Sequence, residues 1–204
     1  AHAVRRNGDT QGAIDRFTEA ALIYETLYNK GAGNKRFRRS ASLTYKNLGS
    51  VYRYSGNGAL ARECYEKALR YDREIIAETP DSVEARLGIS FSHRGLGEAL
   101  NLLKEFDRAI SEFQEAISIQ ENIIANDPKN AFAADNLRDS YSGIAIAFRE
   151  KNAFPESEGF FRKALKLDSG RIRAHADTLQ RLYNASIRME FAELLMKRAK
   201  GAEN

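Results

Sequence analysis

The sequence contains few of the residues that form disulfides, loops and metal sites. Among 204 residues there are one cysteine, Cys64, three prolines and three histidines. One cysteine cannot form an intrachain disulfide or supply a cysteine-based metal site. Three prolines are few for an all-β protein of this size, because its many turns would use more. These absences favour a helical protein and fit a reducing compartment, so we expect a cytoplasmic location.

Long hydrophobic runs are also missing. No stretch approaches the roughly 18 apolar residues of a membrane span, and no signal-peptide pattern opens the chain. The sequence begins with Ala1 and has no initiator methionine, from which we expect a fragment of a longer protein. Charged residues make up 29% and the net charge is +4. This mild excess does not by itself argue for nucleic acid as a partner.

A repeat with a period of about 48 residues runs through the sequence without gaps. Three of its columns carry a small residue, an aromatic residue and an alanine, at intervals of four and then three. Such intervals place side chains on one face of a helix, where alternating small and large groups let helices pack closely. The columns are Ala13, Ala61, Ala109 and Ser157; Phe17, Tyr65, Phe113 and Phe161; and Ala20, Ala68, Ala116 and Ala164.

Signals that end and begin helices recur with the same period. Pro80 recurs as Pro128, and proline has no N–H to donate in a helix interior. Ser82 supplies N-cap chemistry after Pro80, and residues 56–58, Gly-Asn-Gly, break the second hairpin. Gly170 could end the eighth helix early. We expect about nine helices, at residues 2–7, 10–30, 36–55, 58–79, 82–103, 106–127, 130–151, 154–175 and 178–199.

The repeat resembles a known family. Its best copy has a glycine followed three residues later by an aromatic, then the second-helix columns and a proline: Gly49, Tyr52, Gly56, Ala61, Tyr65, Ala68 and Pro80. This pattern resembles the tetratricopeptide repeat (TPR), in a long variant whose period exceeds the usual length of about 34 residues. The resemblance implies an all-α, right-handed solenoid of antiparallel helical hairpins.

The 48-residue period divides the expected array into repeats. We expect one TPR-like array over residues 1–204, with a truncated first repeat and a terminal capping helix. Its parts are 1–33, 34–81, 82–129, 130–177 and the cap 178–200. The segments around the two prolines are also similar to TPR arrays attached to some bacterial Ser/Thr protein kinases. The kinase motifs themselves are absent, so the chain would be the interaction or regulatory tail of such a kinase.

Catalytic, cofactor and metal sites are not expected. His93 occupies the column of Tyr45 and Tyr141, so we interpret it as a packing residue. Cys64 has no neighbour that would reliably lower the pKa of its thiol. Carboxylates are scattered over helical surfaces, and neither of the other two histidines has a His or Cys at ligand spacing. We therefore expect no enzymatic activity.

By the same resemblance, the first helix of each repeat lines a concave groove. The register assigns groove positions in all four repeats: His2, Arg5 and Arg6; Leu43, Lys46, Ser50, Arg53 and Tyr54; Phe91, Arg94, Glu98, Asn101 and Leu102; and Asp139, Ser142, Ile146, Arg149 and Glu150. The cations make the N-terminal half of this groove basic. Because arginine binds carboxylates bidentately, an acidic or C-terminal peptide segment is a suitable ligand.

Two other regions are candidates for binding. Lys35, Arg36, Arg38 and Arg39 begin a helix, where cations oppose the helix dipole. We interpret them as a solvated helix start, with phosphate or an acidic partner as the alternative. The terminal helix carries an apolar set through which two copies could pair: Ile187, Phe191, Leu194, Leu195 and Met196.

The expected function is that of a protein-interaction scaffold that binds a peptide in its groove. Self-association through the terminal helix is an alternative, as is a kinase regulatory tail. A nucleic-acid-binding array is less favoured, because acidic residues such as Glu98 and Asp139 are mixed with the cations of the groove.

Overall fold

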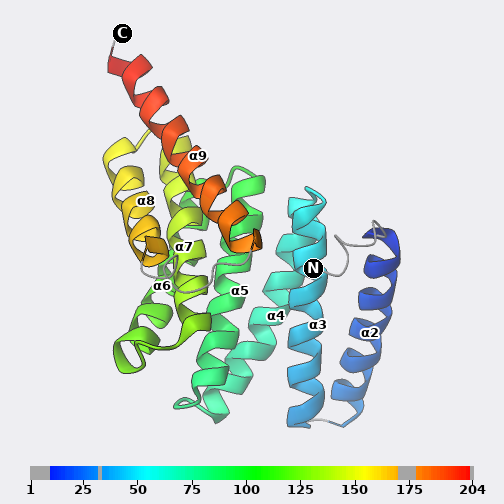
Figure 1. Ribbon diagram of the computed structural model, residues 1–204. Coiled ribbons are helices and arrows are strands. Elements are labelled where there is room, and N and C mark those ends of the chain that lie inside the picture. Colours follow the sequence, from blue (N-terminus) through cyan, green and yellow to red (C-terminus); the bar gives the residue numbers. More distant parts are fainter. Residues whose placement is uncertain (1–9, 32–33, 170–177, 203–204) are drawn as a thin grey trace. The chain divides into compact units, whose positions relative to one another are not determined.

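A computed structural model describes residues 10–31, 34–169 and 178–202, and these contain eight helices and no strand (Figure 1). The predicted helix at 2–7, with the groove residues His2, Arg5 and Arg6, lies outside the described residues, as does Gly170. The helices are α2 (Thr10–Lys30), α3 (Lys35–Tyr54), α4 (Gly58–Glu78), α5 (Val83–Leu102), α6 (Phe106–Asn126), α7 (Ala131–Glu150), α8 (Phe154–Ser169) and α9 (Thr178–Ala202).

The helices form two compact units. The first unit spans Ala1–Glu105 and the second Phe106–Asn204. Within the first, α2 packs against α3, α3 against α4, and α4 against α5. Within the second, α6 packs against α7, α7 against α8, and α8 against α9. This succession of packed neighbours confirms the all-α, TPR-like fold class, while the single array over residues 1–204 stays a prediction.

Helix starts follow the period of the repeat. Asn34, Ser82 and Asn130 are the N-caps of α3, α5 and α7. Each side chain accepts a hydrogen bond from a backbone N–H of the first turn, which satisfies a group that the helix itself leaves unpaired. The cap predicted at Ser82 is confirmed, and α4 ends at Glu78, just before Pro80.

The turns between paired helices repeat as well. Gly56, Lys104 and Asn152 have φ values of 79°, 61° and 60°. They occupy the same position in successive repeats and turn the chain from α3 to α4, from α5 to α6 and from α7 to α8. Only glycine adopts this left-handed conformation without cost, and asparagine tolerates it better than lysine.

The predicted packing columns form the core. In the three repeats after the first, all nine column positions are buried: Ala61, Tyr65 and Ala68; Ala109, Phe113 and Ala116; and Ser157, Phe161 and Ala164. In the first repeat Ala13 is buried, and Phe17 is partly buried against the core of the first unit. The columns chosen from the sequence are therefore the ones on which the helices pack.

The aromatic column residues of the two middle repeats each meet a glycine on the first helix of the next repeat. A Cβ built on Gly95 would lie 2.3 Å from Tyr65 Cε1, and one on Gly143 would lie 2.4 Å from Phe113 Cζ. Real Cβ atoms do not approach other atoms so closely, so the ring occupies the space that any larger residue would need. In the last repeat a phenylalanine, Phe191, replaces this glycine. Its ring contacts the column residue Phe161, with ring centroids 5.9 Å apart.

The terminal helix uses part of its apolar set internally. Ile187 and Leu194 are buried, whereas Leu195 and Met196 are exposed. Two of the five residues proposed for pairing are therefore buried and two are exposed, and pairing of two copies through this helix stays a prediction. No helix in the described ranges is long and apolar enough to cross a membrane.

A glycine substitution tests the ring contact. We expect Gly143→Ala to lower the free energy of unfolding by about 1–3 kcal/mol, because the new methyl overlaps the ring of Phe113. The control is Gly159→Ala on α8, where a Cβ meets nothing within 4 Å. The control should be neutral or stabilising by up to about 1 kcal/mol, since alanine favours the helix. Urea unfolding measures both, and equal stabilities would contradict the proposed contact.

Candidate functional site

Most of the predicted groove residues lie on two helices of the first unit. Helices α3 and α5 begin consecutive repeats and contact each other directly. Between them they carry seven of the nine principal groove residues: Lys46, Ser50, Arg53, Tyr54, Arg94, Glu98 and Asn101. The other two, Ser142 and Arg149, lie on α7 in the second unit. The structure therefore brings one group together on the α3–α5 face.

Two arginines share one glutamate at the centre of this face. Arg53 Nε on α3 lies 3.0 Å from Glu98 Oε2, and Arg94 Nη1 donates to Glu98 Oε1 at 2.7 Å. The guanidinium of Arg53 also stacks over the ring of Tyr54 at 4.0 Å, and that of Arg94 lies over the ring of Phe91 at 4.7 Å. We call Arg53, Arg94 and Glu98 the arginine–glutamate cluster.

The cluster is charged and mostly buried. Burial acts to raise the pKa of the Glu98 carboxyl, but the charges of Arg94 and Arg53 outweigh it, so the pKa lies below its ordinary value. Burial acts to lower the pKa of the Arg53 guanidinium, and the charge of Glu98 outweighs it in the same way, so that this pKa is raised. The cluster thus brings two guanidinium groups from different repeats to one carboxylate.

Apolar side chains flank the cluster along the same two helices. Leu43 and Tyr54 on α3 and Leu102 on α5 are exposed by 59%, 63% and 47%, and Phe91 is half-buried. Leu43 occupies the same repeat position as Phe91, and Tyr54 the same position as Leu102. In the fourth repeat these positions hold Asp139 and Glu150 instead. The α3–α5 face thus combines exposed apolar side chains with paired charges.

Lys46 has an internal partner that the sequence did not reveal. Its ammonium lies 2.9 Å from both carboxylate oxygens of Asp72 on α4. The same carboxylate accepts hydrogen bonds from Ser42 at 2.5 Å and from Ser92 at 2.6 Å. Burial lowers the pKa of the Lys46 ammonium, and the charge of Asp72 offsets part of that effect. A polar pair recurs at the same two positions of the next repeat, where Ser140 donates to Gln120, and this recurrence is the sequence signal for the contact.

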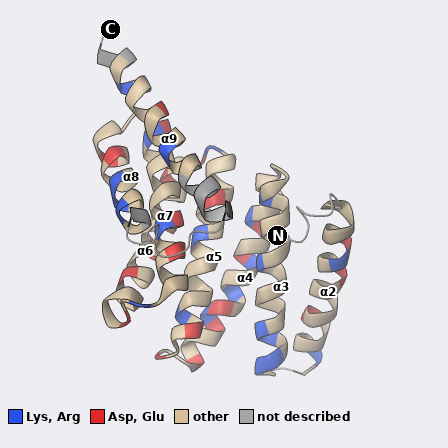
Figure 2. Ribbon diagram, in the orientation of Figure 1, with Lys and Arg blue, Asp and Glu red and all other residues tan. Residues whose placement is uncertain are grey.

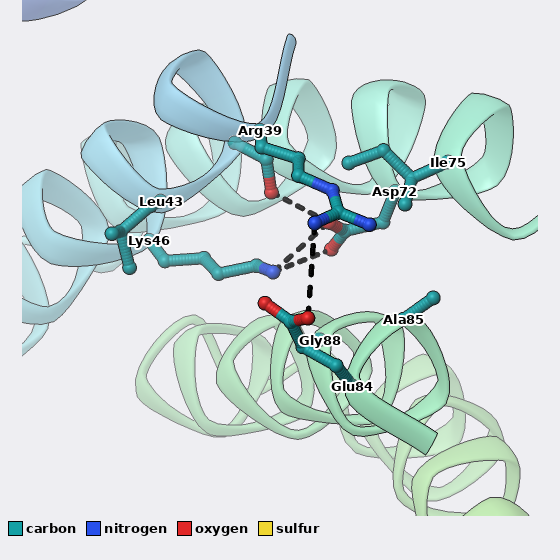
Figure 3. Close-up of a pocket in the computed structure, with 9 residues that line it drawn as sticks. Arg39, Leu43, Lys46, Asp72, Ile75, Glu84, Ala85 and Gly88 are labelled. Carbon is teal, nitrogen blue, oxygen red and sulfur yellow. Dashed lines mark hydrogen bonds and ion pairs between the residues drawn. The ribbon is translucent and has the colours of Figure 1, made fainter. Parts of the chain in front are cut away.

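These residues form the floor of a pocket between α3, α4 and α5 (Figure 3). The pocket has a volume of about 220 Å³. Figure 3 shows the side chains of Lys46 and Asp72 extending toward each other, with Glu84 on the α5 side. Arg39 Nη1 lies 3.7 Å from Glu84 Oε2, and this ion pair links α3 to α5. The residues that line the pocket are Arg39, Ser42, Leu43, Lys46, Asp72, Ile75, Glu84, Ala85 and Gly88.

Three other predicted groove residues are buried or half-buried. Ser50 is buried, donates to the carbonyl of Lys46 and is hydrogen-bonded to the hydroxyl of Tyr65 at 2.9 Å. Ser142 is buried on α7, and Asn101 is half-buried on α5. A role for these three residues in ligand binding stays a prediction.

In the second unit, Arg149 is paired with carboxylates. Its Nη1 lies 2.5 Å from Glu190 Oε2 and 3.2 Å from Glu193 Oε2, both on α9. Its Nε lies 3.0 Å from Glu150. Arg149 therefore ties α7 to α9 in the way that Arg53 ties α3 to α5.

Figure 2 shows the basic run as a blue segment at the start of α3. Three of its four cations form ion pairs with carboxylates. Arg38 is buried and pairs with Glu74 and Glu78 on α4, at 3.3 and 2.5 Å. Lys35 also pairs with Glu78, at 3.3 Å. Arg39 pairs with Glu84, as described above. These contacts favour a structural role for the run and weaken the case for phosphate as its ligand.

Residues with catalytic or metal-binding side chains occupy packing positions. His93 is buried on α5 and Cys64 on α4. Burial raises the pKa of the Cys64 thiol to about 12, which keeps it protonated and poorly nucleophilic near neutral pH. Within the described ranges there is no group of three or more His, Cys, Asp or Glu residues that could hold a metal ion.

Comparison with known proteins points to one repeat family. Residues 42–75 and 95–123 each match sequence models of the tetratricopeptide repeat. No curated protein matches the chain. A similar solved structure is that of BtubC (BKLC) from P. vanneervenii, which is 14% identical, with a TM-score of 0.51 over 96% of this chain and 92% of that one. At this identity the likeness concerns the fold alone.

The arginine–glutamate cluster makes stability depend on pH. Because the pKa of Glu98 is lowered by folding, its ionised form stabilises the protein above about pH 4.3, and this stabilisation is lost as pH falls through the lowered pKa. We expect Glu98→Gln to cost about 1–3 kcal/mol near pH 7, since it leaves two arginines without their shared carboxylate.

The cost should be smaller at pH 3, because below about pH 4.3 the unfolded chain binds a proton at this carboxyl and the wild type loses part of its advantage. Denaturant unfolding at both pH values measures it. The control is Glu84→Gln, which removes an exposed carboxylate from the same helix and should change stability by no more than about 0.5 kcal/mol. A cost for Glu98→Gln that is independent of pH would contradict this account.

Proposed function

The chain contains tetratricopeptide repeats, and on this premise we propose that it is a non-enzymatic scaffold that binds a peptide segment of a partner protein along α3 and α5. Repeats of this family generally mediate protein–protein interactions. The peptide would run along the first helices of two consecutive repeats, over the arginine–glutamate cluster.

The convergence of two arginines supports this proposal. Arg53 and Arg94 come from different repeats and both contact Glu98, so a carboxylate of the ligand that reaches this point meets two guanidinium groups. Guanidinium groups bind carboxylates through paired N–H donors, which adds directional specificity to the charge. We infer that the peptide carries an acidic side chain or its C-terminal carboxylate at this point.

The flanking apolar side chains supply the remaining contact area. Leu43, Phe91, Tyr54 and Leu102 bracket the cluster on the two helices. Aromatic and arginine side chains dominate the binding energy of many interfaces, because they bury large areas at low entropic cost. A peptide with apolar residues on both sides of its acidic group would therefore fit this face. The cytoplasmic location and the kinase parent of such a scaffold stay predictions.

Self-association through α9 is the second candidate. Met189, Leu195 and Met196 are exposed, and together with the partly buried Phe191 they give this helix apolar surface. The area would be covered if two copies paired.

Peptide selection tests the first proposal. Peptides selected from a random display library should be enriched in Asp or Glu, and fluorescence anisotropy should show weaker binding as salt rises. We expect the double variant Arg53→Gln/Arg94→Gln to lose at least about tenfold in affinity, since a charge-assisted hydrogen bond contributes about 1.5–3 kcal/mol. The control Arg36→Gln removes an exposed charge from α3 and should bind normally. Selected peptides without acidic residues, or unchanged affinity in the double variant, would refute the proposal.

Sedimentation velocity tests the second candidate. If α9 mediates pairing, the sedimentation coefficient rises with concentration in the wild type and stays at the monomer value in Leu195→Glu/Met196→Glu. Both residues are exposed, so the substitutions should not disturb the core. A monomer at every concentration would exclude the dimer.

A further inference from the structure

We propose that the pocket between α3, α4 and α5 is a specificity subsite for an uncharged carboxamide side chain, glutamine or asparagine, of the bound peptide. This inference rests on the proposed function, because it assigns one residue of the peptide to one pocket. It concerns the space above Lys46 and Asp72 and not the arginine–glutamate cluster (Figure 3).

The pocket has room for a side chain because α5 carries a glycine there. A Cβ on Gly88 would lie 3.3 Å from Lys46 Nζ and would crowd the ammonium. Glycine is the least favourable residue in a helix interior after proline, so its presence there calls for a reason. The equivalent positions of the neighbouring repeats hold Ser40 and Asn136. The space is therefore particular to this junction of two repeats.

The charges that line the pocket cancel in pairs. At the floor, Lys46 is neutralised by Asp72, and at the opening, Arg39 is neutralised by Glu84. A charged occupant would bring an uncompensated charge into a partly dehydrated site, which is unfavourable for either sign. Because its charges are balanced, the pocket favours an uncharged occupant.

The hydrogen bonds at the floor require a polar tip on that occupant. Each oxygen of Asp72 already accepts a hydrogen bond from a serine and lies 2.9 Å from the ammonium of Lys46. The ammonium of Lys46 has three donors, and the two oxygens of Asp72 account for two of them. A wholly apolar occupant would remove water from the third without replacing its acceptor.

A carboxamide meets both conditions. Its carbonyl oxygen can accept from Lys46, and its NH₂ group can donate to the carboxylate of Glu84, which lies on the other side of the pocket (Figure 3). The methylene stem would contact the apolar side chains of Ile75 and Ala85. A phenol has one O–H donor where a carboxamide has two N–H donors, so it can form fewer hydrogen bonds with Lys46 and Glu84.

The subsite also fixes a spacing in the ligand. Lys46 and Arg53 are two turns apart on α3, which is roughly 10 Å along a helix. An extended peptide covers that distance in about three residues. The expected ligand therefore has its amide residue about three positions from its acidic residue.

Side-chain analogues test the subsite directly in the full chain. Butyramide, butyrate, n-butylammonium and p-cresol would be titrated while the backbone amide resonances of Ala85 and Gly88 are followed by ¹⁵N–¹H NMR. We expect butyramide to give saturable shifts and to bind at least threefold more tightly than the other three compounds. Equal or tighter binding of butyrate or p-cresol, or no shift up to about 200 mM butyramide, would overturn the proposal.

Charge variants at the opening make the test sharper. Glu84 and Arg39 are exposed by 82% and 49%, so neither substitution should unfold the chain. Glu84→Gln leaves a positive excess and should turn the preference from butyramide to butyrate. Arg39→Gln leaves a negative excess and should turn it to n-butylammonium. Preferences that stay the same in both variants would show that charge balance does not govern the pocket.

Gly88→Ala tests the role of space. We expect it to weaken butyramide binding at least threefold, whereas the control Gly159→Ala leaves it unchanged, with circular dichroism confirming that both variants are folded. Wild-type affinity in a folded Gly88→Ala variant would count against the subsite. Peptide binding that depends on Arg53 and Arg94 without butyramide binding would defeat the subsite alone. Butyramide binding without any peptide binding would defeat the proposed function.

Discussion

The contact between an aromatic ring and a glycine of the next repeat determines how each unit is built. Tyr65 extends from α4 to Gly95 on α5, and it also touches the place where a Cβ of Gly49 would lie on α3. The ring of Tyr65 therefore determines how closely α3, α4 and α5 pack against one another. Its hydroxyl bonds Ser50, and its pKa is raised first by burial and then by the charge of Glu98. The ring thus lies beneath the arginine–glutamate cluster, which exists only because α3 and α5 come this close.

The repeat keeps its packing positions and varies its surface positions. Phe113 and Gly143 reproduce the ring–glycine contact in the second unit, as the period requires. The surface position of Leu43 instead becomes Phe91 and then Asp139. A packing position is constrained by the neighbouring repeat, whereas a surface position is constrained only by its ligand. The surface positions that differ between repeats are therefore the ones that indicate binding. They are apolar on α3 and α5 and acidic on α7.

Sequence reasoning placed α2 to α7 within one residue at both ends, because caps, breaks and periodic columns are local signals. It also placed the groove residues on the first helices of the repeats. It did not find the partners of their charges. Lys46 and Asp72 lie on different helices of one repeat, and Arg53 and Glu98 lie in different repeats. Such pairs depend on rotamers and on the distance between helices, neither of which a repeat period specifies. The repeat register therefore overestimates the positive charge of the groove, because it does not include the carboxylates that pair with the cations.

Pairing within the fold changes what the groove can recognise. A cation bound to an internal carboxylate attracts an acidic ligand weakly, since the ligand meets both charges at short range. Lys46 and Arg39 are each paired with a carboxylate of their own, whereas Arg53 and Arg94 both contact the carboxylate of Glu98. Affinity for an acidic peptide should then arise at one position of the groove rather than along its length. At the remaining positions selectivity depends on hydrogen-bond geometry and shape, which change less with salt than long-range attraction does.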